Sequence, residues 1–160
     1  MNQLYFTWAR AFVFVGALSS VNVVFAATTA LPGTHTLTSK HGFGTLMARV
    51  ETAIGAQKMG LVATASASAA AAGRGVKIPG NAVLMVFRND YAVRMLQDSI
   101  SAGIEAPIRI YVTENPDGTA SVTYRTPSAV FAPYQSDKLN ALAAELDPIF
   151  ERIVRDAVGN

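Results

Sequence analysis

Cysteine is absent from the 160 residues, which excludes both a disulfide framework and a zinc site built on thiolates. Tryptophan occurs only once, and charged residues make up only 15% of the chain. The formal net charge is +2, so the chain has no large excess of basic residues with which to follow a phosphate backbone. We therefore expect no nucleic-acid partner.

Long uncharged apolar stretches are also scarce, and the main one lies at the N-terminus. Residues 11–25 (AFVFVGALSSVNVVF) carry no charge and follow Arg10. Val24-Phe25-Ala26 offers small or β-branched residues to signal peptidase, which predicts a signal peptide over 1–26 that is cleaved after Ala26. An uncleaved membrane anchor is the alternative, but the run is short and is interrupted by polar residues. We expect a periplasmic or secreted protein that does not span the membrane after cleavage.

The mature chain is long enough for one domain. Removing 26 of the 160 residues leaves 134, and because Arg10 is the only charged residue removed, 12 basic residues remain against 11 acidic ones. A chain of this length can bury one hydrophobic core without disulfides. Residues 27–34 are rich in small residues, Pro and Gly, and are interpreted as a flexible leader. Residues 35–160 then form a single domain.

The first half of this domain predicts alternating strands and helices. Residues 35–39 and 61–65 have strand composition, and the apolar residues between them recur at helical spacing over 43–58. Gly60 is expected to supply the left-handed residue that ends this helix. The Ala-rich residues 66–75 favour one or two helical turns, with an adaptable loop as the alternative.

A continuous apolar run then predicts a central strand over residues 82–87. We expect this strand to be buried on both faces of the sheet, with Met85 and Phe87 fully in the core. Asn89 or Asp90 can cap the helix that follows. The apolar positions of that helix are Ala92, Met95, Leu96 and Ile100, before Gly103 ends it.

A β-hairpin is the clearest local pattern in the chain. Residues 108–114 and 120–126 alternate between apolar and polar side chains, and Asn115-Pro116-Asp117-Gly118 between them is a turn sequence. A long C-terminal helix follows, with its apolar face at Leu139, Leu142, Leu146, Ile149 or Phe150, and Ile153. Pro148 removes a backbone donor from this helix, so we expect a kink or a restart with Asp147 as the cap.

These elements together predict the α+β class, because they include a hairpin and no regular strand–helix–strand repeat. We expect a mixed or mostly antiparallel sheet with helices packed on one face.

Several short motifs follow one another in a characteristic order. They are Phe43-x-Thr45 at a helix start, Gly60-Leu61 after it, Phe87-Arg88-Asn89-Asp90 at a strand end, Ala106-Pro107 before a strand, Glu114-Asn115-x-Asp117-Gly118 in the hairpin, and Tyr124-x-Thr126-Pro127 after it. In this order they resemble the bacterial "domain of unknown function 302" family over about residues 36–132.

The resemblance implies a small α+β domain, dimeric in some members, with no established activity, cofactor or catalytic residue. Many members have an Asp-His pair before the central strand, but Ser66 and Ala67 stand there in this chain. A role of that pair in proton transfer or metal binding therefore does not apply here. Asp90 stands where many members have Pro, which resembles an exported subgroup.

The residue types for nucleophilic catalysis and metal binding are sparse. Without cysteine, a Ser or Thr nucleophile needs a base, usually histidine. His35 and His41 lie in no recognised nucleophile motif and are interpreted as solvated loop residues. The methionines of the mature chain fall at apolar positions, where core packing explains them better than a copper site does. We expect no catalytic residue of this kind, no metal and no cofactor.

Two sets of residues are candidates for ligand binding. Arg88, Asn89 and Asp90 stand where a strand runs into a helix N-terminus, which favours an anion. In the alternative interpretation, Asn89 and Asp90 cap the helix and Arg88 pairs with a nearby acid.

The second set lies on the hairpin. Arg109, Tyr111 and Arg125 share the face opposite Ile108 and Ile110, and such a face can dock a carboxylate ligand or another subunit. The alternative is an exposed sheet surface with cross-strand pairs.

The sequence therefore favours a non-enzymatic periplasmic module that binds a small anionic ligand or a protein partner, with a homodimer left open. The alternative is a small-molecule enzyme with a cleft formed by the Arg, Asn, Asp and Tyr side chains of both sets. A cleft that joins them would favour ligand binding or catalysis, whereas an apolar sheet edge without a cleft would favour assembly.

Overall fold

The computed structural model describes residues 30–159, so the predicted signal peptide and its cleavage site lie outside the described residues. The elements are β1 (Thr34–Ser39), α1 (Phe43–Ala56), β2 (Gly60–Ala65), α2 (Ala67–Ala72), β3 (Asn81–Phe87), α3 (Asn89–Asp98), the 3₁₀ helix η1 (Ser101–Glu105), β4 (Ile108–Glu114), β5 (Ala120–Arg125), α4 (Pro127–Phe131), the 3₁₀ helix η2 (Ala132–Tyr134) and α5 (Asp137–Val158). The predicted α+β class is confirmed.

The five strands form one sheet in the order β1-β5-β4-β3-β2, and every neighbouring pair is antiparallel. The predicted hairpin is β4–β5, with Val112 opposite Val122. The turn closes as its composition predicts, because Asn115 N donates to Thr119 O at 2.8 Å and Gly118 has a φ of +81°. This hairpin fixes the register at the centre of the sheet.

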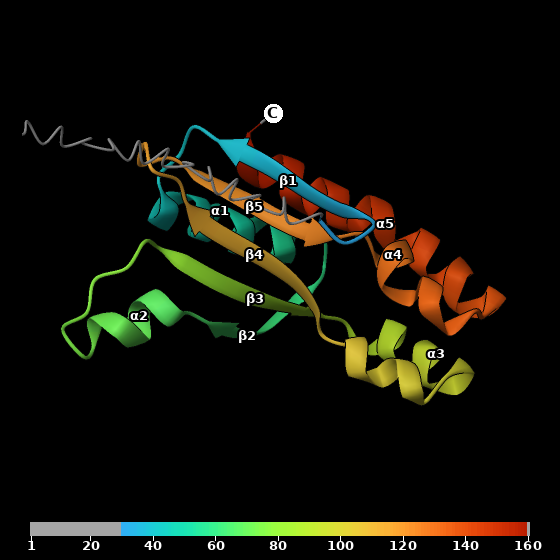
Figure 1. Cartoon of the computed structure of the whole chain (residues 1–160). Coiled ribbons are helices and arrows are strands. Elements are labelled where there is room, and N and C mark those ends of the chain that lie inside the picture. The colour runs from blue at the N-terminus through green and yellow to red at the C-terminus, as the bar shows by residue number, and fades with distance from the viewer. Residues whose placement is uncertain (1–29, 160) are drawn as a thin grey trace, which may run out of the picture.

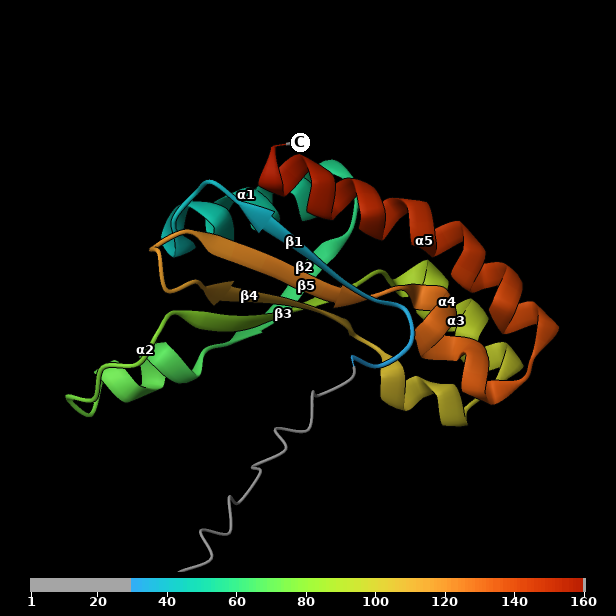
Figure 2. The same ribbon diagram turned by 45° about the horizontal axis from the view of Figure 1, so that its top comes forward.

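Helices α1 and α5 pack against each other and cover one face of the sheet, as Figures 1 and 2 show. The core between the layers contains the fully buried side chains Leu46, Val50, Leu84, Ile110, Val112, Phe150 and Ile153. α3, η1 and α4 gather at one end of the sheet, and α2 projects at the other. The predicted packing of helices on one face is confirmed. No helix among residues 30–159 is long and apolar enough to cross a membrane.

The predicted burial of both faces of the 82–87 strand is wrong. In β3 the buried residues are Ala82, Leu84 and Val86, whereas Met85 and Phe87 are only partly buried. The strand lies inside the sheet between β2 and β4, but only one face of the sheet carries a helix layer among the described residues (Figures 1 and 2). A side chain on the other face therefore keeps contact with solvent, even in an apolar run.

Some predicted helix ends also require correction. After α1, Lys58 takes the left-handed conformation (φ +56°), whereas Gly60 begins β2 opposite Phe87. A Cβ at Gly60 would lie 3.2 Å from the carbonyl oxygen of Phe87, so the glycine permits a close strand approach instead of ending the helix. α3 ends at Asp98, and Ile100 beyond it is 84% exposed instead of facing the core.

The predicted restart at Pro148 does not occur, because α5 runs unbroken from Asp137 to Val158. Asp147 does not cap this helix. Its carboxylate accepts hydrogen bonds from the Ser128 backbone N (2.9 Å) and hydroxyl, and so ties α5 to the start of α4. The N-cap of α5 is Ser136, whose hydroxyl accepts from Leu139 N.

Candidate functional site

The face of the sheet opposite α1 and α5 carries the second set of predicted site residues. Along β4, Ile108, Ile110 and Val112 are buried against the helices, so the residues between them point the other way. Arg109 and Tyr111 are accordingly exposed on the open face. The predicted division of the hairpin into an apolar and a polar face is thus correct.

The register places two arginines side by side on this face. Tyr111 lies opposite Thr123 and Ile110 opposite Tyr124 at the end of the ladder, and Arg109 and Arg125, the next residue on each strand, line the same hollow. Like charges on neighbouring strands repel each other and destabilise a sheet. The pair therefore concentrates positive charge at one point of the open face.

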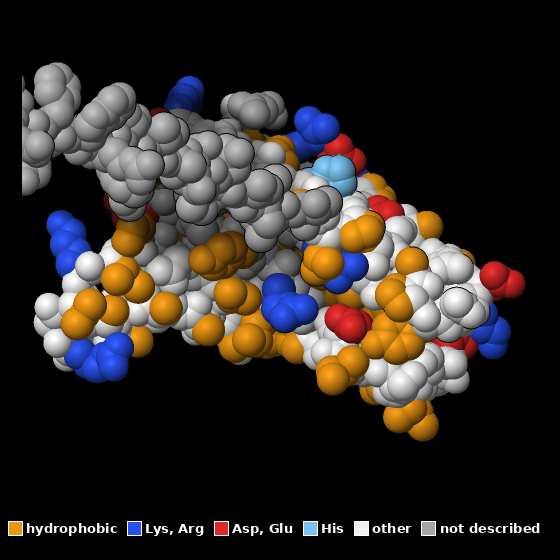
Figure 3. Space-filling model, viewed as in Figure 1, with side chains coloured by type: hydrophobic (Ala, Val, Ile, Leu, Met, Phe, Trp, Pro, Cys, Tyr) orange, Lys and Arg blue, Asp and Glu red, His pale blue; other side chains and the backbone are white. Residues whose placement is uncertain are grey.

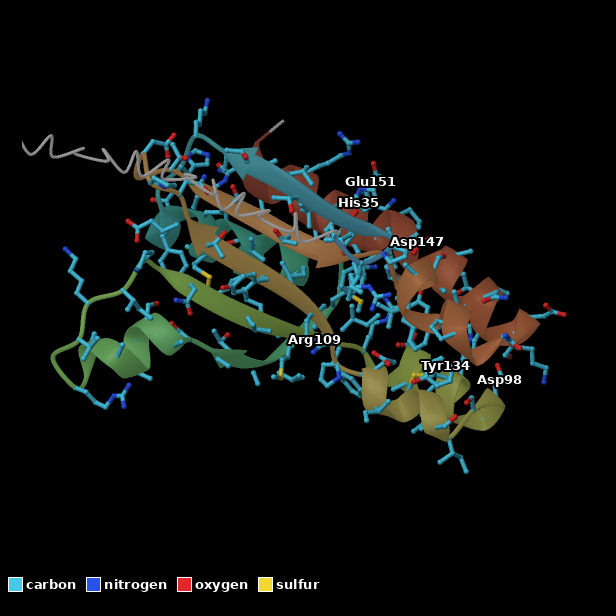
Figure 4. The ribbon with its side chains drawn as sticks, viewed as in Figure 1. His35, Asp98, Arg109, Tyr134, Asp147 and Glu151 are labelled. Atoms are coloured by element: carbon cyan, nitrogen blue, oxygen red, sulfur yellow. The ribbon has the colours of Figure 1, made fainter. Side chains whose placement is uncertain are left out.

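The two guanidinium groups have no acidic partner within the described residues. Arg125 Nη2 donates to the Ala129 carbonyl oxygen at 2.9 Å, and its Nε lies 3.5 Å from the Pro32 carbonyl oxygen. The Arg109 side chain forms no hydrogen bond with any of residues 30–159 and projects from β4 in Figure 4. These uncharged carbonyl oxygens orient the Arg125 guanidinium but do not neutralise its positive charge.

A hollow of about 230 Å³ lies at this pair and is called the sheet hollow below. Arg109, Tyr111, Thr123 and Arg125 line it from the sheet, Glu105 from η1 and Val130 from α4. The Glu105 carboxylate accepts a hydrogen bond from the Tyr134 hydroxyl at 3.2 Å, and burial together with this bond raises the pKa of Tyr134. Figure 3 views this face and shows basic side chains beside acidic and hydrophobic ones in its middle part. With one carboxylate against two guanidinium groups, the lining carries a formal charge of +1.

The first set of predicted residues has a different environment. Arg88 Nε and Nη2 donate to the two carboxylate oxygens of Asp90 at 2.8 and 3.1 Å, and the guanidinium lies 4.2 Å from the centre of the Tyr91 ring. The hydrogen bond from Arg88 lowers the pKa of Asp90. Arg88 therefore pairs with a nearby acid, as the alternative interpretation predicted.

The predicted capping at this helix start is wrong. α3 begins at Asn89, its N-cap is Arg88, and no side chain accepts a capping hydrogen bond there. Asp90 lies in the first turn, where a negative charge favours the helix dipole, but its oxygens bind the Arg88 side chain. Arg88 also borders a separate small apolar hollow of about 30 Å³ between β3, α3 and α5.

The structure thus divides the six predicted residues between two places. Arg109, Tyr111 and Arg125 meet in the sheet hollow, whereas Arg88 borders the apolar hollow and Asn89 and Asp90 are exposed at the start of α3. Among residues 30–159, no group of three or more His, Asp or Glu side chains is arranged to hold a metal ion.

Ser66 and Ala67, at the position of the Asp-His pair, have a structural role in this chain. Ser66 is the N-cap of α2, and its hydroxyl accepts from Ala69 N at 3.1 Å and donates to the Asn81 carbonyl oxygen at 2.7 Å. The hydroxyl thereby joins the start of α2 to the start of β3.

Sequence reasoning missed two contributors to hollows in the structure. Glu105 reaches the sheet hollow because η1 folds back beside β4, and no local pattern in the sequence signals that approach. His35 is in β1 and not in a loop, and its ring stacks on Tyr124 with centroids 5.7 Å apart. It borders a third hollow together with Asp147 and Glu151 of α5. The Thr-rich composition of residues 35–39, which predicted a strand, could have placed His35 in that strand.

Comparisons with known proteins agree with this architecture. The crystal structure of an uncharacterised conserved DUF302 protein from Bacillus stearothermophilus is similar to this chain, with a TM-score of 0.71 and 16% sequence identity. The similarity covers 79% of this chain and 98% of that protein, and at such low identity it shows the shared fold alone. The search of curated proteins gave no significant match. The family model for "Domain of unknown function DUF302" matches residues 35–157, which includes α5 beyond the motifs seen in the sequence, and the chain therefore belongs to the DUF302 family.

Proposed function

We propose that this protein is a non-enzymatic binding module that takes a small carboxylate ligand in the sheet hollow. The observation that carries the proposal is the pair of arginines in one hollow, Arg109 and Arg125, without an ion-pair partner among residues 30–159. A carboxylate between them would relieve their mutual repulsion and accept charge-assisted hydrogen bonds from both guanidinium groups.

The rest of the lining suits an amphipathic ligand. Val83 and Val130 supply apolar contacts, and the exposed Tyr111 supplies both an aromatic ring and a hydroxyl. The volume of about 230 Å³ limits the ligand to a small molecule. A short organic acid with an apolar body therefore fits better than a large polyanion.

Binding is favoured over catalysis because the enzymatic alternative needs Arg88, Asn89 and Asp90 beside Tyr111 and Arg125. Arg88 instead borders the apolar hollow and is paired with Asp90. The sheet hollow has two positive side chains to bind an anion, but its single carboxylate, Glu105, already accepts from Tyr134.

The test is calorimetric titration with benzoate and succinate, with phosphate as a third probe. We expect a carboxylate to bind, and Arg109→Gln to weaken it about tenfold or more, because a hydrogen bond to a charged group contributes about 1.5–3 kcal/mol. Arg88→Gln is the matched control, since it removes an arginine that already has an acidic partner. Equal affinity in the two variants, or no binding of any probe to the wild type, would refute the proposal.

We also propose that residues 1–26 export the protein to the periplasm or beyond the cell. The uncharged run after Arg10 and the residues before Ala27 support this. A reporter fused to residues 1–26 should cross the inner membrane, and the N-terminus of the mature protein should lie within about two residues of Ala27. A cytoplasmic protein that still begins at Met1 would contradict it.

A further inference from the structure

The two edge strands of the sheet differ in how well they are protected from strand addition. β2 is irregular, because its pairing with β3 shifts register between Leu61 and Ala63. A bulge of this kind is a common device that blunts a sheet edge. β1, at the other edge, pairs with β5 over six consecutive residues without a shift.

The hydrogen-bonding pattern shows which backbone groups β1 presents at its outer edge. Thr126 N donates to the Gly33 carbonyl oxygen at 2.9 Å, so Gly33 and Thr126 are a hydrogen-bonded pair. Such pairs alternate along an antiparallel ladder, so the backbones of His35, Leu37 and Ser39 bond to β5. The N–H and C=O groups of Thr36 and Thr38 must then point away from the sheet.

Side-chain distances support this assignment. Thr36 and Thr123 are opposite each other, and their hydroxyl oxygens lie 2.8 Å apart. Side chains approach most closely in the pairs that are not hydrogen-bonded. Within residues 30–159, the outward N–H and C=O groups of Thr36 and Thr38 have no hydrogen-bond partner. They form a regular template for one more strand.

A hollow of about 320 Å³ lies beside this edge, on the helix side of the sheet, and is called the edge hollow. His35 and Leu37 of β1 border it, and Asp147, Glu151 and Arg155 of α5 face them. Figure 4 shows His35, Asp147 and Glu151 near one another, at a distance from Arg109. With His35 neutral, two carboxylates and one guanidinium give the lining a formal charge of −1.

The electrostatic field in the edge hollow is consistent with this charge. Burial and then the negative charges of Glu151 and Asp147 raise the pKa of the Tyr124 phenol. Arg155 Nε lies 2.8 Å from a carboxylate oxygen of Glu151 and balances its charge. Asp147 accepts hydrogen bonds from the uncharged Ser128, so its negative charge is not balanced by a basic residue in the edge hollow. A basic side chain would complement it.

We propose that the outer edge of β1 binds an extended segment of a partner protein, which adds as a sixth strand and places a Lys or Arg side chain in the edge hollow. Alternate side chains of an added strand point toward the helix layer, which is the side on which the edge hollow lies. Main-chain hydrogen bonds to Thr36 and Thr38 supply affinity, and the charged hollow supplies specificity.

The test uses an extended peptide of alternating threonine and lysine, about six residues long to match β1. We expect hydrogen exchange at the Thr36 and Thr38 amides to slow when the peptide binds. The amide of Leu37 is an internal control, because it already bonds to β5. A peptide with glutamate in place of lysine should bind more weakly, and a peptide N-methylated on the edge facing β1 should not bind.

Two variants separate the edge from the hollow. Glu151→Gln should weaken binding of the lysine peptide about twofold to fivefold, whereas Glu145→Gln, another α5 glutamate paired with an arginine, should not change it. Thr36→Pro removes an outward N–H and should abolish binding. The variant should still fold, because proline is tolerated on edge strands. If this variant fails to fold, the N-methylated peptide makes the same test.

Three results would overturn the proposal: the glutamate peptide binds as well as the lysine peptide, other amides are protected, or the lysine peptide does not bind. Protection of Thr36 and Thr38 that rises with protein concentration without peptide would instead identify a second copy as the occupant. Arg109→Gln should leave peptide binding unchanged, so this proposal and the carboxylate proposal fail independently.

Discussion

Arg88 and Arg109 both stand at strand ends, yet their surroundings differ. Asp90 follows Arg88 by two residues and holds its guanidinium, and Tyr91 lies beneath it. Arg109 instead shares a hollow with Arg125, which comes 16 positions later in the chain. The first arrangement could be predicted from adjacent residues. The second depended on the length of the 115–118 turn, which sets the register of the hairpin.

The Arg88–Asp90 pair predicts a pH dependence of stability. The hydrogen bond from Arg88 lowers the folded-state pKa of Asp90 below its ordinary value of 3.8. This contribution to stability is therefore present above pH 3.8 and is lost as the pH falls through the folded-state pKa. Urea unfolding of the wild type and Asp90→Asn should differ most at about pH 6, and the difference should shrink as the pH falls through the folded-state pKa of Asp90.

Arg88→Gln supplies the control for this prediction. If Arg88 lowers the pKa of Asp90, this variant should lose the same pH-dependent component of the unfolding free energy as Asp90→Asn. Because the pair is exposed, added salt should also reduce the difference. A difference between wild type and Asp90→Asn that stays constant over this pH range would show that the ion pair does not stabilise the fold.

Residue burial could be predicted from the sequence only where alternation was visible. Alternation in residues 108–114 correctly put Arg109 and Tyr111 opposite the core. The apolar run 82–87 has no alternation, so its pattern could not show that Met85 and Phe87 face the side without a helix layer. The number of covered faces depends on where helices distant in the sequence pack, and a strand does not encode that locally.

At the scale of elements, the junction of β1 with α4 depends on one glycine. Gly33 has a φ of +72°, and a Cβ there would lie 2.2 Å from the Cβ of Ala129 and 2.8 Å from the Thr126 hydroxyl. Gly33→Ala should therefore lower the free energy of unfolding by about 2–4 kcal/mol, since it combines left-handed strain with a steric clash. Urea unfolding measures this loss.

Gly55→Ala is the matched comparison for Gly33→Ala. Gly55 lies in α1, and a Cβ there would meet no atom within 4 Å. The same substitution should raise the free energy of unfolding by about 0.5–1 kcal/mol, because alanine favours helix over glycine. A loss of stability in both variants, or in neither, would mean that the junction at Gly33 does not control the packing of β1 on α4.

Element types were easier to predict than their ends. The helical spacing of residues 43–58 and the alanine run 66–75 correctly predicted α1 and α2. The end of α3 was missed because Leu96 and Ile100 continue the helical period, but the chain turns into η1 and leaves them 44% and 84% exposed. Helical periodicity records which residues are apolar, but it does not show where the helix leaves its contact with the core.

At the scale of the whole molecule, stability is distributed unevenly. The layer of α1 and α5 on β3, β4 and β5 contains most of the buried apolar side chains. The segment from Gly60 to Gly80, with β2 and α2, has a single buried residue, Ala71. Figures 1 and 2 show α2 projecting away from the helix layer. Burial is the main source of folding free energy, so this segment should open without unfolding the rest.

Native-state hydrogen exchange should therefore find two levels of protection. Amides of α5 and β4 should exchange only through global unfolding, and those of α2 should exchange faster and independently of the global unfolding free energy.

Ser66→Ala, which removes the N-cap hydroxyl of α2, should speed exchange in α2 further while changing the urea midpoint only slightly. Ser136→Ala is the matched control, because it removes the N-cap of α5 and should lower the midpoint itself by weakening the helix on which the core packs. If α2 amides were as slow as those of α5, or if both variants lowered the midpoint equally, the molecule would unfold as one cooperative unit and β2–α2 would belong to it.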